Sequence, residues 1–342
     1  MSASITRRDA GRLLGAGLAA SLASPRIARA ADPVRLRVSL DTAPAHMRNV
    51  SIADYLKKLE AASGGRIKTE LFSSGALFAD LNVAKALVEG QVEMACPGSW
   101  TLTGFVPDCD FFSLPTMFGQ SLDVVHRATD GAVGGIINDQ LHQKLRVEVL
   151  GPWLDLGFQN WYSATRPLNG YADLKGMKIR NSGGAGNAWR TRFFEAIPNT
   201  TAWPNVPLAL SQHTFDGLIT TNESTASAKL YEAGVTSSLQ DRQSINVYIP
   251  LISGRFWDGL PPELRTLMVD TWKQNIPRYR ENMAGSQQTA YKTLVEKGVK
   301  MTAPPDSEIA RIRAQMQPQE VQVGKELRIS PELMAQMGSV VG

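Results

Sequence analysis

Cysteine and histidine are scarce in this chain, which has 2 cysteines and 4 histidines among 342 residues. So few thiols exclude a disulfide-rich scaffold and a four-thiolate zinc site, and four histidines leave little for histidine-based metal chemistry. The sequence therefore predicts neither a metal nor a cofactor. Cys96 and Cys109 either form a disulfide or lie buried as two thiols, and their spacing leaves both alternatives open.

Charge of one sign is also missing from the body of the chain. The formal net charge of +4 comes from residues 1–30, which carry five arginines and one aspartate, so the remainder is neutral. A neutral body removes the basic surface that nucleic-acid binding needs. Charged residues make up 20% and hydrophobic residues 43%, which is typical of a soluble globular protein and excludes a disordered chain or a polytopic membrane protein.

The first thirty residues have the pattern of an export signal. Arg7 and Arg8 precede an apolar stretch at residues 13–23, and Ala28-Arg29-Ala30 offers a small-x-small cleavage site. The stretch is too short for a bilayer span, which needs about 20 residues. The pattern predicts a twin-arginine-type signal over residues 1–30, a periplasmic location and no direct membrane insertion. The alternative is an amphipathic N-terminal helix of a cytosolic protein.

Strand and helix patterns alternate from residue 34 to about residue 235. The predicted strands are 36–40, 67–72, 92–95, 147–150, 177–180 and 218–221. The predicted helices between them lie around 52–59, 83–88, 186–196 and 206–215. Such alternation predicts an α/β fold with mostly parallel sheets covered by helices.

One helical pattern is much longer than the others and runs from Pro261 to about Lys297. A helix of that length spans about 54 Å, more than one domain of this size, so it is expected to cross two domains. We expect a two-domain periplasmic-binding-protein fold with a cleft and hinge strands. The first domain comprises residues 31–156 plus about 242–280, and the second comprises residues 157–241 plus about 281–342 and the C-terminal helices. Ligands in such folds bind in the cleft, at the carboxyl ends of strands.

Common enzyme signatures are absent from the sequence. It has no Gly-x-Ser-x-Gly nucleophile motif, no His-Glu-x-x-His motif and no P-loop. The glycine-rich residues 183–188 lack the third glycine of a dinucleotide fingerprint. They fit either an anion site at a helix N-terminus or a simple tight turn. The sequence therefore predicts a protein that is not an enzyme.

Two polar residues stand where ligand-facing loops are expected. Arg180 ends a predicted strand, where its guanidinium can hold a carboxylate by two parallel hydrogen bonds; a surface salt bridge is the alternative. His46 follows the first predicted strand and either contacts a ligand or is structural.

Four tryptophans follow predicted strands, namely Trp100, Trp153, Trp161 and Trp203. Tryptophans often belong to cores, but those at strand ends also suit the apolar wall of a cleft. We expect two of the four to contact a ligand, and name Trp100, Trp161 and Trp203 as candidates.

Several motifs resemble the solute-binding proteins of TRAP (tripartite ATP-independent periplasmic) transporters. The central ones are DLKGMKIR at residues 173–180, WPNVPLAL at 203–210 and FDGL at 215–218. Residues 43–46, 63–67, 87–95 and 166–168 also fit, so the resemblance covers essentially the whole mature chain. It implies two α/β domains, a hinge and a long helix crossing both.

The resemblance also implies a site. It assigns the ligand carboxylate to Arg180 and an aromatic wall to Trp203. The remaining residues that it implies are Thr220 with Thr221 and Asn222 adjacent, and Ser99 and Trp100 from a loop of the first domain. Two departures make the pocket less charged: Gln159 stands where many members have a second arginine, and Leu218-Ile219 stands where many have a polar or acidic residue. A second carboxylate on the ligand thereby loses an obvious partner.

These features predict a periplasmic receptor that binds a small organic acid and delivers it to the membrane subunits of a TRAP transporter. The alternatives are a sensing module for a signalling partner and a periplasmic enzyme on the same scaffold. Substrate turnover would distinguish the enzyme from the receptor, and the partner would distinguish the sensor.

Overall fold

The computed structural model describes residues 32–341. The predicted export signal over residues 1–30 lies outside the described residues. None of the helices in the described part is long and apolar enough to cross a membrane. The part from Pro33 onward is one compact unit that contains two sheets.

The first sheet contains five strands among the described residues, in the order β2-β1-β3-β10-β4. Their bounds are β1 Val34–Ser39, β2 Ile67–Phe72, β3 Met94–Ala95, β4 Val147–Val149 and β10 Leu251–Ser253. β1 pairs in parallel with β2 and β3, whereas β10 is antiparallel to β3 and β4. The predicted strand at 67–72 is confirmed, and β10 brings a distant part of the chain back into this sheet.

The second sheet contains six strands in the described range, in the order β11-β9-β5-β8-β6-β7. Their bounds are β5 Leu154–Ser163, β6 Lys178–Asn181, β7 Ile197–Thr200, β8 Gly217–Thr220, β9 Ser237–Tyr248 and β11 Lys300–Thr302. β6 is parallel to β7 and β8, and β5 is antiparallel to β8 and β9. The mixed α/β fold with two sheets agrees with the predicted class.

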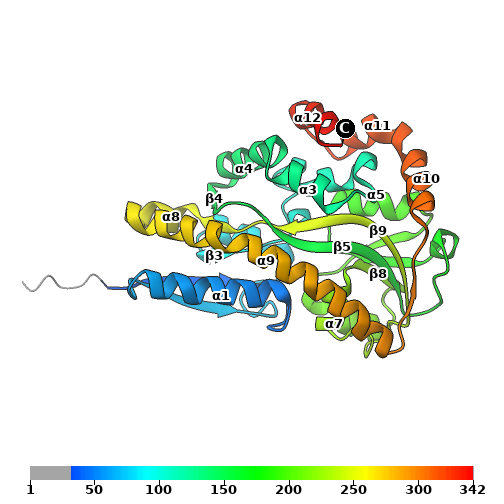
Figure 1. The fold of residues 1–342 in the computed structure, drawn as a ribbon, viewed down its shortest axis with the longest axis horizontal. Helices are drawn as coiled ribbons and strands as arrows, with labels where there is room; N and C mark the ends of the chain where they lie inside the picture. Colours follow the sequence, from blue (N-terminus) through cyan, green and yellow to red (C-terminus); the bar gives the residue numbers. More distant parts are fainter. Residues whose placement is uncertain (1–31, 342) are drawn as a thin grey trace, which may run out of the picture. The chain divides into compact units, whose positions relative to one another are not determined.

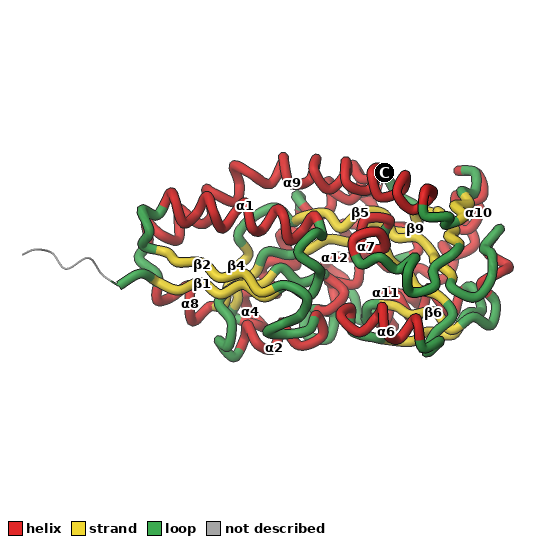
Figure 2. Tube along the Cα trace, turned by 90° about the horizontal axis from the view of Figure 1, so that it is seen from below, coloured by secondary structure: helices red, strands yellow, loops and turns green. Residues whose placement is uncertain are grey.

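Helices cover both sheets (Figures 1 and 2). Their bounds are α1 Met47–Ala62, α2 Asp80–Val88, α3 Leu122–Thr129, α4 Ala132–Leu145, α5 Ala185–Phe193, α6 Val206–Ser211, α7 Asn222–Ser227, α8 Gly254–Gly259, α9 Pro262–Glu296, α10 Asp306–Met316, α11 Glu320–Glu326 and α12 Pro331–Val341. The helices predicted at 186–196 and 206–215 end earlier than expected. Gly217 does not end a helix but begins β8, because a tight turn separates α6 from that strand.

The helix predicted over 261–297 is confirmed as α9, which has 35 residues. It packs against α1 beside the first sheet and against α7 beside the second, so it spans both halves of the unit (Figures 1 and 2). The Trp272 Nε1–H donates to the carbonyl of Pro152 at 2.9 Å, which anchors the helix just before β5. The helix continues through Gly285 without a break.

The C-terminal helix α12 packs against α3 and α4 (Figure 1). Leu333, Met337 and Val340 join the hydrophobic core that covers one face of the first sheet. Residues 281–342 are expected in the second domain, whereas this packing places the end of the described chain on the first sheet's side. Long-range apolar contacts of this kind are not visible in local periodicity.

The long antiparallel strands β5 and β9 join the two halves, and their pairing is irregular. Its register shifts between Asp155 and Gly157 and again between Gln159 and Trp161. Gly157 has φ of +108°, and a Cβ there would lie 2.6 Å from Nε2 of Gln287 on α9. That same Nε2 donates to the carbonyl of Leu156 at 2.8 Å. Glycine is favoured here because the backbone angle is one that side chains rarely adopt, and a Cβ would also displace the Gln287 side chain.

Candidate ligand-binding site

A small cavity of about 20 Å³ lies between the two halves. It is lined by Asp41, Thr42, Asp80, Trp100, Leu156, Gln159, Arg180, Ser182, Trp203, Thr220, Ser224 and Tyr248. Many of these residues come from the carboxyl ends of β1, β6 and β8 or from the segments that follow them. This is the edge of an α/β sheet at which ligands bind. Ligand pockets usually measure about 300–1,000 Å³, so the two halves must lie further apart than here to hold an organic acid.

Arg180 is the cation of this cavity and is 1% exposed. Its Nε and Nη2 donate to the carbonyl of Thr201 at 2.9 and 2.7 Å, and its guanidinium carbon lies 5.4 Å from the centre of the Trp203 ring. Burial lowers the pKa of Arg180 to about 10, so the group stays protonated at neutral pH. It forms no salt bridge with any residue of the described range, which leaves Nη1 for a ligand.

The cavity has further unused donors. Trp100 is 8% exposed, and its Nε1–H has no hydrogen-bond partner among the described residues. Gln159 accepts a hydrogen bond on Oε1 from Ser244 Oγ at 3.3 Å, while its Nε2 donates to no described group. A buried donor without a partner costs about 1–3 kcal/mol. A ligand that brings acceptor oxygens would recover this free energy.

Two carboxylates also line the cavity. Asp41 forms a salt bridge with Arg48 at 2.6 Å. Asp80, at the start of α2, accepts the backbone N–H of Trp203 at 3.1 and 3.2 Å, so it ties the first sheet's side to the second. Burial raises the pKa of Asp80 to about 6, the charge of Asp41 adds to this rise, and Arg180 opposes it.

The structure brings five of the predicted site residues together around the cavity, namely Arg180, Trp203, Gln159, Thr220 and Trp100. The other four, which are Ser99, His46, Trp161 and Asn222, do not line it. Asn222 accepts the Tyr162 hydroxyl at 2.5 Å and donates to Gln240 Oε1 at 3.0 Å, so its side chain serves the second half's own polar network. Ser99 lies in the turn that carries Trp100.

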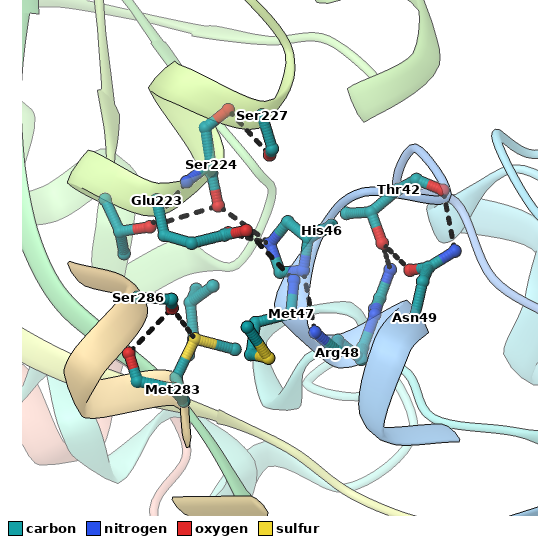
Figure 3. A network of polar contacts seen from close by, with 12 residues as sticks. Thr42, His46, Met47, Arg48, Asn49, Glu223, Ser224, Ser227, Met283 and Ser286 are labelled. Carbon is teal, nitrogen blue, oxygen red and sulfur yellow. Dashed lines mark hydrogen bonds and ion pairs between the residues drawn. The ribbon is translucent and has the colours of Figure 1, made fainter. Parts of the chain in front are cut away.

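His46 belongs to a contact between the two halves, which we call the clasp and define as His46, Met47, Glu223 and Ser224 (Figure 3). His46 Nε2 lies 2.8 Å from Glu223 Oε2 and 3.1 Å from Ser224 Oγ. The backbone N–H of Met47 donates to Glu223 Oε1 at 2.9 Å. The clasp therefore joins the start of α1 to the start of α7 while His46 itself is fully buried.

The tautomer of His46 follows from its partners. Its Nδ1 accepts the backbone N–H of Arg48 at 3.1 Å, so the proton of the neutral ring is on Nε2. That proton lies toward Ser224 Oγ, with Glu223 Oε2 close by, and Nε2 has no lone pair with which to take the Ser224 proton. A catalytic serine needs an unprotonated histidine nitrogen next to its hydroxyl, so this Ser–His contact is not a nucleophile–base pair.

Trp161 lies in the core of the second half. It is fully buried, and its Nε1–H donates to Asp241 Oδ2 at 2.8 Å. Asp241 is also fully buried, and desolvation raises the pKa of its carboxyl to about 7. Trp161 is expected to follow a strand, but it lies within β5, and its ring packs in the apolar core of this half.

Asp241 leads to an expected pH dependence of stability. An unfolded aspartate titrates at about 3.9, so between there and a pH of about 7 the folded state binds more protons than the unfolded state. The free energy of unfolding contributed by this group therefore falls as the pH rises through that window. Asp241→Asn removes the titration, and its melting temperature should fall less steeply with pH than that of the wild type.

The control for this measurement is Asp130→Asn, at a carboxylate that is 38% exposed and paired with Arg280. That variant should keep the wild-type slope. Equal slopes for Asp241→Asn and the wild type would contradict the assignment of the slope to Asp241.

The sequence analysis missed several residues of the cavity, namely Asp41, Thr42, Asp80, Leu156, Ser182, Ser224 and Tyr248. Asp41 and Thr42 directly follow the first predicted strand, so their position was a usable signal. Tyr248 ends β9, whose sequence SSLQDRQSINVY lacks the alternation of a strand although nearly all of it is buried. Its polar side chains are hydrogen-bonded instead, as when Ser238 Oγ donates to the carbonyl of Trp161 at 2.7 Å.

The glycine-rich residues 183–188 hold an anion that the protein itself supplies. The backbone N–H of Gly186, at the start of α5, donates to Asp110 Oδ2 at 2.9 Å. A Cβ on Gly186 would lie 2.2 Å from that of Ser113, so the turn packs closely against this segment. Cys96 and Cys109 are both buried and both free thiols.

Comparison with known proteins identifies the family. The profile described as "Bacterial extracellular solute-binding protein, family 7" matches residues 41–325. The chain belongs to this family. Among its curated relatives, the C4-dicarboxylate-binding periplasmic protein DctP of Rhodobacter capsulatus is 27% identical over 267 residues, which are 77% of each chain. The 2,3-diketo-L-gulonate-binding periplasmic protein YiaO of Escherichia coli is 25% identical over 286 residues, 84% of each chain.

Solved structures of TRAP periplasmic solute binding proteins have the same fold. The sugar acid binding protein DctPAm of Advenella mimigardefordensis, in complex with galactonate, has a TM-score of 0.84 at 20% identity, covering 90% of this chain and 98% of the other. A TRAP periplasmic solute binding protein of Sulfurospirillum deleyianum with bound succinate has a TM-score of 0.82 at 21% identity, covering 90% and 99%. This family 7 protein is thus a two-domain solute-binding protein with a cleft and a long helix spanning both domains.

Proposed function

We propose that this family 7 protein is a periplasmic receptor that binds a small organic acid between its two halves and delivers it to the membrane subunits of a TRAP-type transporter. The observation that carries the proposal is Arg180, a buried cation that lines the cavity without a salt bridge to any described residue. A buried guanidinium without a counter-charge is costly, and a ligand carboxylate would supply that charge.

The contacts of Arg180 support a particular geometry. Because Thr201 holds Nε and Nη2, the guanidinium plane is fixed and a carboxylate would approach Nη1 and the free edge of Nη2. Trp203 would wall the ligand body, and the Nε2 of Gln159 would donate to a ligand oxygen. With glutamine rather than a second arginine at position 159, we expect one carboxylate to bind there, not two.

The relatives support an acid as the ligand. Similar structures contain succinate, galactonate and D-erythronate, each a carboxylate. Their low identity leaves the particular acid open. The names of the curated relatives place those proteins in the periplasm, which fits the twin-arginine-type signal that we propose for residues 1–30.

A receptor is favoured over an enzyme by the clasp. Ser224 lines the cavity and touches His46, but the proton on His46 Nε2 prevents that histidine from activating the serine. We also propose that the two halves move about β5 and β9, where the register shifts lie, and that the ligand stabilises the closed form. The chain crosses between the halves at these strands and along α9.

A binding screen of the mature chain tests the proposal. A ligand at 100 times its dissociation constant stabilises a protein by about 2.7 kcal/mol, so the right acid should raise the melting temperature visibly. We expect monocarboxylates to do so and the bound acid to be recovered unchanged, one per chain, by native mass spectrometry. The absence of any shift with organic acids would contradict the receptor, and chemical conversion of the acid would favour an enzyme.

A further inference from the structure

The cavity is acidic as well as basic, and this bears on what its ligand carries besides a carboxylate. Asp80 is 4% exposed and the side chain of Asp41 is 12% exposed, and both line the cavity together with Arg180. Polar residues enclosed in this way do not exchange their partners freely with water. Each charge therefore needs a partner from the protein or from the ligand.

The charges are not all matched within the protein. Asp41 has Arg48, at 2.6 Å. Asp80 has only hydrogen bonds from the backbone, and within residues 32–341 it forms no salt bridge; the same is true of Arg180. Arg180 and Asp80 attract each other across the cavity, but neither has a counter-charge within salt-bridge distance. Trp100 Nε1, a buried donor without a partner at the same cavity, is independent evidence that a polar ligand completes this site.

A ligand with one carboxylate and no other charge would supply a counter-charge to Arg180 but not to Asp80. It would neutralise Arg180 and leave the carboxylate of Asp80 enclosed beside a second anion, the ligand itself. A ligand hydroxyl would donate a hydrogen bond to Asp80 but would not neutralise it. A ligand that carries one carboxylate and one ammonium group would match Arg180 and Asp80 together and leave the cavity neutral.

We propose that the ligand is a small zwitterion whose carboxylate binds Arg180 and whose ammonium group binds Asp80, with Asp41 next to it. The inference rests on the proposed function, because it takes Arg180 as the carboxylate site. Two further features agree with it. Burial and the charge of Asp41 both raise the pKa of Asp80, and a cation placed there would offset both effects. Trp100, which lines the same cavity, offers an aromatic ring that attracts an ammonium group, whereas the Tyr248 ring already carries the Arg48 guanidinium at 4.0 Å from its centre.

The experiment compares acids that differ in one group. Isothermal titration calorimetry would measure binding of propionate, lactate and alanine, and of butyrate, 4-hydroxybutyrate and 4-aminobutyrate, to the mature full chain. In at least one series the amino acid should bind more tightly than both analogues by about tenfold or more, which is about 1.4 kcal/mol. Equal or tighter binding of the hydroxy acid or of the unsubstituted acid in both series would overturn the inference.

The variant Asp80→Asn then tests the residue. Asparagine keeps an oxygen for the Trp203 N–H, so closure retains that hydrogen bond, but the negative charge is lost. The preference for the amino acid over its hydroxy analogue should fall by about tenfold. The readout is the ratio of the affinities for the amino acid and for its hydroxy analogue. A general weakening of closure lowers both affinities equally and therefore leaves this ratio unchanged. Asp130→Asn, far from the cavity lining, should keep the wild-type ratio; an unchanged ratio in Asp80→Asn would overturn the inference.

The outcomes separate this inference from the function on which it rests. Carboxylates that bind without any preference for ammonium would refute the zwitterion and leave the receptor for organic acids intact. If methylamine or propylamine bound as tightly as the amino acids, Arg180 would not be the carboxylate site. That result would refute both the zwitterion and the receptor for organic acids. If no compound of either series bound, that result would also count against both the zwitterion and the receptor.

Discussion

Arg180→Met should remove most of the affinity for organic acids while the protein remains folded. The guanidinium is buried, held by Thr201 and without a salt bridge to another described residue, so its loss leaves the ligand carboxylate enclosed without a counter-charge. Truncating one partner of a buried charge pair costs about 2–5 kcal/mol, a weakening of about 30-fold to several thousand-fold. Calorimetric titration with the best acid of the screen would measure this.

Arg190→Met is the matched control for that variant. Arg190 is equally buried, lies in the same half, and has a pKa that burial also lowers to about 10. Its Nη2 donates to the carbonyl of Phe112 at 3.1 Å, and it does not line the cavity. We expect this variant to melt at a lower temperature but to bind the acid as the wild type does. Near-native affinity in Arg180→Met would refute Arg180 as the carboxylate site.

Glu223→Ala should weaken ligand binding without touching the ligand. Glu223 does not line the cavity, but it accepts from Met47 N–H and contacts His46 Nε2 across the two halves. Without it, the Met47 N–H loses its acceptor in the closed form, at about 1–3 kcal/mol, while His46 Nε2 keeps only Ser224 Oγ. Because the apparent dissociation constant rises as the closed fraction falls, the affinity should drop by about tenfold or more.

Small-angle scattering with and without ligand would also detect the smaller closed fraction. The radius of gyration of Glu223→Ala should be larger than that of the wild type. Glu223→Gln keeps an acceptor for Met47 N–H and should lie between the alanine variant and the wild type. Glu232→Ala, at an exposed glutamate of the same half, is the control and should change neither quantity. Unchanged affinity and scattering in Glu223→Ala would show that the clasp does not hold the halves together.

Local patterns in the sequence were sufficient for the elements and for the central residue of the site. The strand at 67–72 and the helix over 261–297 appear in the structure nearly at their predicted bounds, because apolar periodicity and terminal prolines or glycines act within a few residues. Arg180 could be selected for the same reason: it ends a strand, and strand ends meet at one edge of a sheet.

The tertiary structure alone decided which residues share the cavity and which lie behind it. His46 meets Ser224 across 178 positions of the chain, and no local pattern shows that pairing. Trp203 and Trp161 are both expected after strands, yet the ring of Trp203 lies by Arg180, whereas Trp161 lies within β5 with its ring against Phe194. Apolar periodicity does not predict strand β9, because many of its buried side chains are polar and form hydrogen bonds to other strands. Periodicity reports how a segment meets its nearest neighbours, whereas charges and hydrogen-bond partners in a cavity depend on segments that only folding brings together.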